Sequence, residues 1–516
     1  MPALAVFLLI ALPWLNPFAP GPTSSLGPLL FAWLCAALLL GLWVGVGRRM
    51  TGEHWVRAIA LAWLGAAALS AVMGLLQYFG ATAALGQWVR ATEVGLAFAN
   101  LRQRNQFATL INMGLLASLW WALQGRVASG AVGVAPAGRG FLAYSATTTH
   151  VATPTLLALA VLLGAANAAS SSRTGLLQLV VVAALVALWG RWREPRVGLV
   201  MLAASATYVL ALVALPWLAG LDPGTTAWAR MRAGDAVCGS RLTLWGNVLH
   251  LIAQKPWLGW GWGELDYAHF ITLYPGVRFC DILDNAHNLP LHLAVELGVP
   301  AALALCGTAA GLIWRARPWR EADATRQLAW GVLAVIGLHS LLEYPLWYGP
   351  FQVAAVWCVG LLWRAPPDDK FTRFKALALA SHAPIAIISV VVISALAWDY
   401  HRVRQIFLPP AHRAAAYQTD TLAKAQASWW FVRQVQFAEL TITPLTPGSA
   451  ARLLALTQDL LHFSPEPRVI ETLIDSAALL GHQDDVAFYT VRYQAAFPEQ
   501  YARWKETKGK PGITSR

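Results

Sequence analysis

The chain has 516 residues, of which 57% are hydrophobic and only 12% are charged. Soluble domains usually carry about 25% charged residues, so this composition excludes an ordinary soluble protein. The formal net charge is +12, but the basic residues lie in clusters between apolar runs, a pattern that orients membrane helices. We therefore expect a membrane protein and no nucleic-acid partner.

Apolar runs of roughly 18 or more residues recur along the chain, and each is long enough to cross the hydrocarbon core as a helix. The first run, from Ala3 to Leu15, has no Lys or Arg before it and no clear cleavage site. We therefore expect a retained first helix and not a cleaved signal. We predict about eleven spans, at 2–15, 28–47, 56–79, 105–124, 152–169, 174–190, 197–219, 289–314, 327–345, 350–364 and 376–398.

The connecting segments alternate between two sets with different contents of Lys and Arg. The richer set contains Arg48, Arg49, Arg57, Arg126, Arg139, Arg191, Arg193, Arg196, Arg315, Arg317, Arg320, Arg326, Arg364, Lys370, Arg373 and Lys375. The poorer set includes the longest loop and contains Arg90, Arg102, Arg104, Arg173, Arg230, Arg232, Arg241, Lys255 and Arg278. Because basic residues favour the cytoplasmic side, we predict that the richer set and the N-terminus are cytoplasmic. The C-terminal region is then external.

Three external segments follow from this topology: 80–104, 220–288 and 400–516. The segment 220–288 is far longer than a usual connection, and such loops tend to carry function. The polar segment 400–516 has helical apolar spacing, as in Ala451–Leu461, without a firm repeat period. We therefore predict a transmembrane domain, 1–399, that contains the long loop, and a helical external domain, 400–516.

The long loop ends with the sequence Asp-Asn-Ala-His-Asn-Leu-Pro-Leu-His, which places His287 and Asn288 at the start of a helix. A histidine at the membrane surface can act as a general base near neutral pH. A histidine that only caps a helix start is the alternative interpretation, and the residue alone does not decide between them.

Two external arginines are candidates for binding a phosphate group. Arg173 lies at the external end of a helix pair, and Arg241 begins an amphipathic stretch of the long loop. The guanidinium fork suits phosphate, whereas the alternative is an arginine that extends to the lipid headgroups. The Trp- and Gly-rich segment Lys255–Gly263 is compatible with an interfacial turn or with a flat surface for sugar rings.

Two further polar segments, Asn100–Ala108 and His339–Tyr348, lie at helix ends on the same predicted side. Polar groups so close to lipid need partners. Charges in the middle of the predicted spans are scarce, which disfavours an ion-coupled transporter. The sequence contains no CxxC, P-loop, G-x-G-x-x-G or HExxH motif, so we expect no metal or other cofactor.

The five cysteines fall into two groups. Cys35, Cys306 and Cys358 lie within predicted helices and are expected to be packing groups. Cys238 and Cys280 both fall in the long external loop. If that loop lies in an oxidising compartment, we expect these two cysteines to form a disulfide.

Taken together, these segments resemble a superfamily of bacterial O-antigen ligases, O-antigen polymerases and protein O-oligosaccharyltransferases. His287 and Asn288 are followed by nine residues and Gly298, which is similar to the ligase pattern H-[NSQ]-x9-G-x-x-G. Ala301 stands where the pattern has its last glycine, a change that affects helix packing more than chemistry. The pilin-glycosylating oligosaccharyltransferase branch is resembled most, in the segments Gly74–Gly80, Asn100–Ala108, Pro256–Gly261, His339–Tyr348 and Asp399–Tyr400 and in the polar C-terminal domain.

The resemblance implies an all-α, GT-C-like bundle in a bacterial inner membrane, with the active site and C-terminal domain in the periplasm. It implies transfer of an oligosaccharide from undecaprenyl pyrophosphate to Ser or Thr of a periplasmic, pilin-like protein, without an essential metal. The alternatives are an O-antigen ligase, an O-antigen polymerase and, more remotely, a glycolipid flippase.

The same resemblance assigns roles to individual residues. It implies that Arg173 and Arg241 bind the pyrophosphate and that His287 accepts the proton of the acceptor hydroxyl. Arg278 of the same loop is a further candidate for a phosphate contact. The expected supporting residues are Gln103, Asn105, Asn288, His339, Glu343 and Tyr344.

Overall fold

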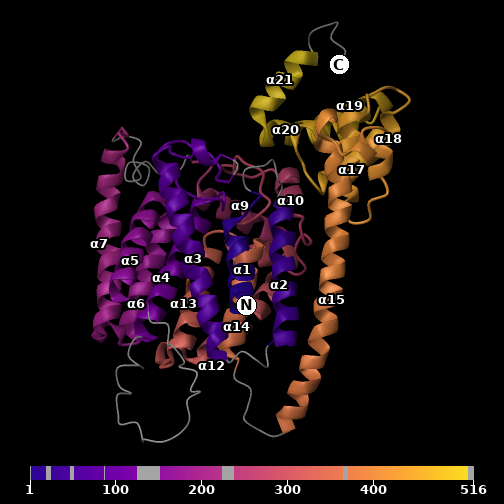
Figure 1. Ribbon diagram of the computed structural model, residues 1–516. Helices are drawn as coiled ribbons and strands as arrows, with labels where there is room; N and C mark the ends of the chain where they lie inside the picture. The colour runs from indigo at the N-terminus through magenta and orange to yellow at the C-terminus, as the bar shows by residue number, and fades with distance from the viewer. Residues whose placement is uncertain are drawn as a thin grey trace, which may run out of the picture. The chain divides into compact units, whose positions relative to one another are not determined.

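The computed structural model describes residues 2–18, 25–46, 52–86, 88–124, 151–222, 237–363 and 370–508, apart from the side chains of 46 and 370–381. Every regular element in these ranges is a helix (Figure 1). The chain forms two compact units. The first comprises Met1–Ala233 and Ile313–Ile393, and the second comprises Gly234–Leu312 and Ser394–Arg516.

The first unit is a bundle of apolar helices around α4. Its helices are α1 (Pro2–Leu15), α2 (Leu26–Val46), α3 (Gly52–Tyr78), α4 (Arg104–Gln124), α5 (Thr153–Ala169), α6 (Arg173–Leu188), α7 (Pro195–Leu218), α13 (Ala324–Ser340) and α14 (Gly349–Leu362). Helix α4 packs against α3, α5, α6, α7 and α13 and is buried over almost its whole length. Small residues allow close packing, since a Cβ on Gly164 of α5 would collide with the backbone of Ala204 in α7.

Within the described residues, six helices are long and apolar enough to cross a membrane, so the chain is a multi-pass membrane protein. Four other apolar helices of this part of the chain, α1, α5, α6 and α14, are shorter. A helix rises about 1.5 Å per residue, so 14 residues cover only about 21 Å of a ~30 Å core. The predicted number of about eleven crossings therefore stays a prediction. Arg48, Arg49, Arg126, Arg139, Arg230, Arg232 and Arg364, on which part of the predicted sidedness depends, lie outside the described residues.

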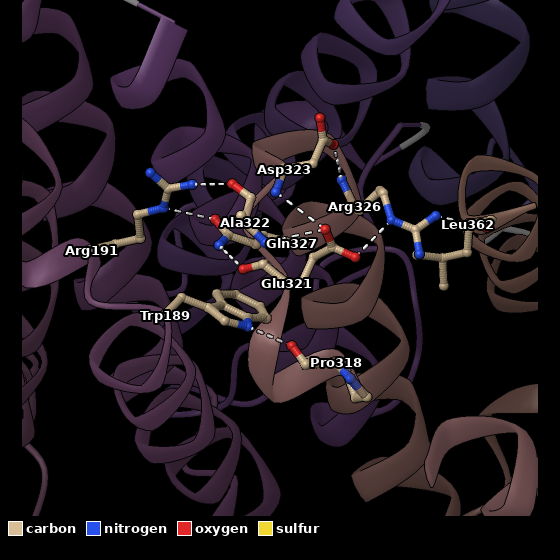
Figure 2. A network of polar contacts seen from close by, with 9 residues as sticks. All are labelled: Trp189, Arg191, Pro318, Glu321, Ala322, Asp323, Arg326, Gln327 and Leu362. Atoms are coloured by element: carbon tan, nitrogen blue, oxygen red, sulfur yellow. Dashed lines mark hydrogen bonds and ion pairs between the residues drawn. The ribbon is translucent and has the colours of Figure 1, made fainter. Parts of the chain in front are cut away.

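At one end of the first unit, three chain segments assigned to the same side of the membrane meet in a polar network (Figure 2). Arg191, after α6, donates to the Gln327 side chain over 2.9 Å and to the Ala322 carbonyl over 2.6 Å. Arg326 donates to Glu321 over 2.7 Å and to the carbonyl of Leu362, at the end of α14, over 2.7 Å. These three segments lie together, as expected if successive helices cross in alternating directions and the segments share one side of the membrane.

The segment 80–104 is held by two buried amide side chains. Gln77, 0% exposed, donates to the carbonyls of Arg90 and Ala99 and accepts from the N–H groups of Phe98 and Ala99. Asn100 donates to the carbonyl of Trp88 over 2.8 Å. These residues lie in two of the segments that resemble the oligosaccharyltransferases, and their role here is structural.

The second unit combines the long loop with the C-terminal helices. The loop forms α9 (Arg241–Gln254), α10 (Leu265–Ile271) and α11 (Leu289–Leu297). The C-terminal part forms α16 (Thr421–Ala425), α17 (Val432–Ile442), α18 (Ala450–Leu461), α19 (Pro467–Leu480), α20 (Gln483–Ala496) and α21 (Pro498–Lys508). Successive helices from α16 to α21 pack against each other, and Phe270 of α10 is buried in their core. The loop therefore packs with the domain that we predicted as separate. Helices α12 (Val299–Ala316) and α15 (Lys370–Arg404) continue from one unit into the other.

The single helix predicted at 289–314 is wrong, because the chain breaks at Gly298 between α11 and α12. Gly298 has φ +87°, and a Cβ there would collide with the backbone of Trp257 and Leu258. The N–H of Trp260 donates to Val295 O over 2.8 Å, and that of Val299 donates to Pro256 O over 2.8 Å. The Trp- and Gly-rich segment is thus a backbone brace for this break.

Candidate active site

The predicted polar residues of the first unit converge at the starts of α4 and α6 and the end of α13. Asn105 donates to the Glu343 carboxylate over 3.1 Å and accepts from the Ser172 hydroxyl over 2.6 Å. Ser172 is also the N-cap of α6, where it accepts from the N–H of Gly175 over 2.9 Å. Arg173, which is exposed, is the first residue of that helix. Ser172 therefore connects Arg173, the next residue in the chain, to Asn105 and through it to Glu343.

A second layer of this network is fully buried. His339, 0% exposed, hydrogen-bonds through Nδ1 to the Thr109 hydroxyl over 2.9 Å. Gln178 donates to that hydroxyl over 2.8 Å, and Asn112 donates to Gln178 over 3.3 Å. Buried polar groups in a membrane bundle are costly and tend to be functional. His339 was a predicted site residue, whereas Thr109, Asn112 and Gln178 were missed.

Gln103 and Tyr344 flank this network. The Gln103 carbonyl accepts from the N–H of Phe107 in the first turn of α4. Tyr344 follows Glu343, and its ring stacks on Tyr348 with 6.0 Å between the ring centroids. Both residues are half-buried. The structure thus groups Gln103, Asn105, His339, Glu343 and Tyr344 with Arg173 in one unit.

The other predicted residues lie in the second unit, where a disulfide and an amide brace the loop. Cys238 and Cys280 form a disulfide with a Cα–Cα distance of 5.3 Å, as the sequence predicts. Asn247 of α9 donates to Val277 O over 3.0 Å and accepts from Phe279 N over 2.8 Å. These contacts fix the segment that carries Arg278 against α9.

Arg241 repeats the arrangement of Arg173. It is the first residue of α9, and the N-cap Ser240 accepts from the N–H of Thr243 over 3.2 Å. Both arginines therefore stand at a serine-capped helix N-terminus, where backbone N–H groups and the helix dipole favour an anion. The sequence analysis predicted the two arginines as candidates. It did not predict that each is the first residue of a serine-capped helix.

Arg278 is partly directed at the protein itself. Its Nη1 donates to Thr272 O over 3.0 Å, and the guanidinium lies 5.5 Å from the centroid of the Tyr274 ring. Burial lowers the pKa of Arg278 to about 10, so it stays a cation at neutral pH. His269 bonds to Tyr274 over 2.7 Å, and burial followed by the charge of Arg278 lowers the pKa of His269 to about 3. Arg278 thus has a structural role, whatever else it binds.

His287 has a strained backbone held by two asparagines. Its φ is +49°, a region that non-glycine residues rarely adopt. The buried side chain of Asn285 accepts from the N–H of His287 over 2.9 Å. Asn288 is the N-cap of α11 and accepts from the N–H of Leu291 over 3.1 Å. The helix cap is therefore Asn288 and not His287.

Asp284 is an acidic neighbour of His287 that was not among the site residues predicted from the sequence. Burial raises the pKa of the Asp284 carboxyl, and the charge of the nearby His287 opposes this rise. A carboxylate beside a histidine stabilises the protonated imidazole. Among the described residues, no group of three His, Cys, Asp or Glu is placed to hold a metal ion.

Comparisons with known proteins cover most of these segments. The O-antigen ligase family profile matches residues 158–306, and that of the protein glycosylation ligases matches 97–122. The C-terminal profile of the virulence factor membrane-bound polymerases matches 327–510. A general O-oligosaccharyltransferase of Acinetobacter baylyi is 27% identical over 164 residues, which are 31% of this chain and 28% of that relative. No solved structure matches significantly.

These matches agree with the resemblance stated from the sequence. Arg173, Arg241, Arg278 and His287 all fall within the O-antigen ligase match, and Gln103 and Asn105 fall within the protein glycosylation ligase match. Together the matches support an oligosaccharyltransferase of the superfamily that includes the O-antigen ligases. The local match spans less than a third of the relative's length.

Proposed function

We propose that the protein transfers an oligosaccharide as one block from undecaprenyl pyrophosphate to Ser or Thr hydroxyls of periplasmic proteins such as pilin. The observation that carries this proposal is His287, held in a left-handed conformation between Asn285 and Asn288 within the segment that matches the O-antigen ligases. A histidine fixed by its neighbours but not used as the helix cap supports a catalytic role.

In this mechanism His287 is the general base. An imidazole nitrogen accepts the hydroxyl proton while the acceptor oxygen attacks the anomeric carbon of the donor sugar. The bond between that carbon and the pyrophosphate oxygen breaks, and the configuration at the carbon inverts. Asp284 stabilises the imidazolium that forms. General-base assistance of this kind contributes typically about 10²–10⁴-fold to the rate.

Arg173 and Arg241 bind the pyrophosphate, whose charge grows as it leaves. Each guanidinium adds charge-assisted hydrogen bonds to the anion preference of its helix N-terminus. Preorganised electrostatic groups of this kind are usually the largest catalytic contribution. The chemistry assigned here uses only side chains of the protein and needs no nucleotide sugar.

Three acceptors are compatible with the transfer chemistry. The match to protein glycosylation ligases at 97–122 and the name of the Acinetobacter baylyi relative support a protein. The polymerase profile at 327–510 favours a second candidate, in which a growing glycan is the acceptor. Transfer to lipid A–core, as in an O-antigen ligase, is a third.

One reconstitution separates a protein acceptor from a growing glycan. Purified protein in proteoliposomes is given an undecaprenyl-pyrophosphate oligosaccharide together with pilin, or with pilin whose Ser and Thr acceptor residues are replaced by Ala. Intact-mass spectrometry is expected to show one glycan mass added to pilin and none to the replaced form. Elongated lipid-linked glycan would support the polymerase alternative, and glycan movement without a new bond would indicate a flippase.

A further inference from the structure

The second unit presents two adjacent tryptophans to the outside. Trp429 is 83% exposed and Trp430 is 52% exposed. Large exposed aromatic side chains are unfavourable in water, so a fixed pair of them marks a binding surface. Mechanistic roles proposed above for the arginines and histidine do not involve these residues.

A buried carboxylate holds the turn that carries them. Asp399, 5% exposed, accepts through Oδ2 from the Ser428 hydroxyl over 2.7 Å and from the N–H groups of Trp429 and Trp430, each over 3.1 Å. Arg402 forms an ion pair with Asp399 at 3.7 Å and donates to Ala427 O over 2.7 Å. The Asp399 carboxylate thus fixes the backbone of the turn that carries the two exposed tryptophans.

Asp399 also marks the point where a candidate membrane span ends. The span His382–Phe407 is only 17% buried within the protein, so most of its surface is available to lipid. No charged residue occurs between His382 and Trp398, and Asp399 is the first. Trp398 is 61% exposed. Asp399 follows Trp398 and binds the backbone of the turn directly. The turn with Trp429 and Trp430 therefore lies beside the part of α15 that carries Trp398.

We propose that Trp398, Trp429 and Trp430, here called the indole patch, insert into the headgroup–acyl boundary of the membrane and hold the C-terminal helices against the lipid surface. Tryptophan is enriched at this depth, where its ring is apolar and its N–H is wet. Trp398 belongs to the exposed surface of α15, and the basic Arg404 follows in the last turn of that helix. A cation there complements anionic headgroups. The proposal does not depend on the transfer reaction.

Nitroxide labels report this contact directly. We would replace Cys35, Cys306 and Cys358 by Ala, keep the Cys238–Cys280 disulfide, and label Trp429→Cys, Trp430→Cys or Val491→Cys in the full chain. Val491 of α20 is 52% exposed, as Trp430 is, and serves as the matched control. The protein is placed in nanodiscs of phosphatidylethanolamine and phosphatidylglycerol, and collisions with oxygen and with a water-soluble nickel chelate are measured.

The labels at 429 and 430 are expected to have an oxygen-to-nickel collision ratio several-fold above that at 491. Equal ratios at the three positions would overturn the proposal. So would labels that become shielded only when pilin or glycan is added, since that would make the patch an acceptor surface. Asp399→Asn is expected to raise the mobility of the label at 429, and unchanged mobility would contradict the role of Asp399.

Discussion

The backbone of His287 distinguishes it from the other histidines that the structure describes. A left-handed conformation costs a non-glycine residue about 1–2 kcal/mol, and here it is maintained by the Asn285 side chain. The sequence placed His287 beside a helix start, and the histidine alone favoured capping over catalysis. The structure assigns the cap to Asn288. Such a dihedral angle depends on tertiary contacts, so no sequence pattern predicts it.

The two capped arginines give the first prediction. Arg173→Ala and Arg241→Ala should each weaken binding of the lipid pyrophosphate donor at least about tenfold, the scale of one charge-assisted hydrogen bond. Lysine at either position should restore only part of the affinity, because it keeps the charge but loses the fork. Donor binding to purified protein measures both effects. Arg468→Ala, at an exposed position of α19, is the matched control, and alanine variants that bind donor like this control would refute the assignment.

Part of the buried polar network of the first unit follows from the sequence spacing of α4. Asn105, Thr109 and Asn112 are spaced by four and three residues, so they share one face of α4. Only Asn105 was selected, because Thr109 and Asn112 lie within an otherwise apolar run. Their partners Gln178 and His339 come from α6 and α13. Those pairings depend on how the helices pack, which a single sequence does not reveal.

At the scale of elements, the break between α11 and α12 gives a second prediction. Gly298→Ala places a Cβ against the backbone of Trp257 at positive φ, so the variant should be destabilised by more than the roughly 1 kcal/mol of an ordinary glycine change. Gly307→Ala is the control, because a Cβ at this α12 position meets nothing within 4 Å. Thermal unfolding in detergent should show a lower midpoint for Gly298→Ala only. Equal midpoints for the two variants would mean that the break is not required.

Helix α10 gives a prediction about pH. Burial, followed by the charges of Glu264 and Asp284, raises the pKa of Asp266 from 3.8 to about 7. Ionising Asp266 is therefore less favourable in the folded state than in the unfolded state. The free energy of unfolding falls for this reason as the pH rises from about 4 to about 7. Asp266→Asn removes this penalty and should be more stable than the wild type at about pH 8, by roughly 2–4 kcal/mol, with little difference at low pH.

Unfolding midpoints of the two proteins between about pH 4 and pH 8 measure this difference. The gap between variant and wild type should widen up to about pH 7 and stay constant above it. A gap that does not change with pH would show that folding does not raise the pKa of Asp266.

At the scale of the whole molecule, the sequence predicted the helical composition and the positions of most helices. It assigned the long loop to the transmembrane domain because the loop lies between two apolar segments of the chain. The structure instead packs α10 on the C-terminal helices, with Glu264 in contact with His462 over 2.6 Å and Tyr267 stacked on the same ring. Contacts between segments about 200 residues apart are set by the fold and are not written in local periodicity.

The membrane topology is testable by fusion. The distribution of Lys and Arg predicts an external position for Arg402 and a cytoplasmic position for Arg193. Alkaline phosphatase, which is active only outside the cytoplasm, should be active when fused after Arg402 and inactive after Arg193. The opposite pattern would invert the predicted sidedness and place the long loop in the cytoplasm, where its proposed substrates are absent.

The most direct test of the account is glycan transfer by His287→Ala in the reconstituted system, with donor binding measured on the same protein. His482→Ala, an exposed histidine at the start of α20, serves as the control for loss of an imidazole. We expect the His287 variant to lose transfer by about 10²-fold or more and to bind the lipid-linked donor as the wild type does. Transfer at the wild-type rate would show that His287 is not the general base, and loss of both transfer and donor binding would place it in the pyrophosphate site instead.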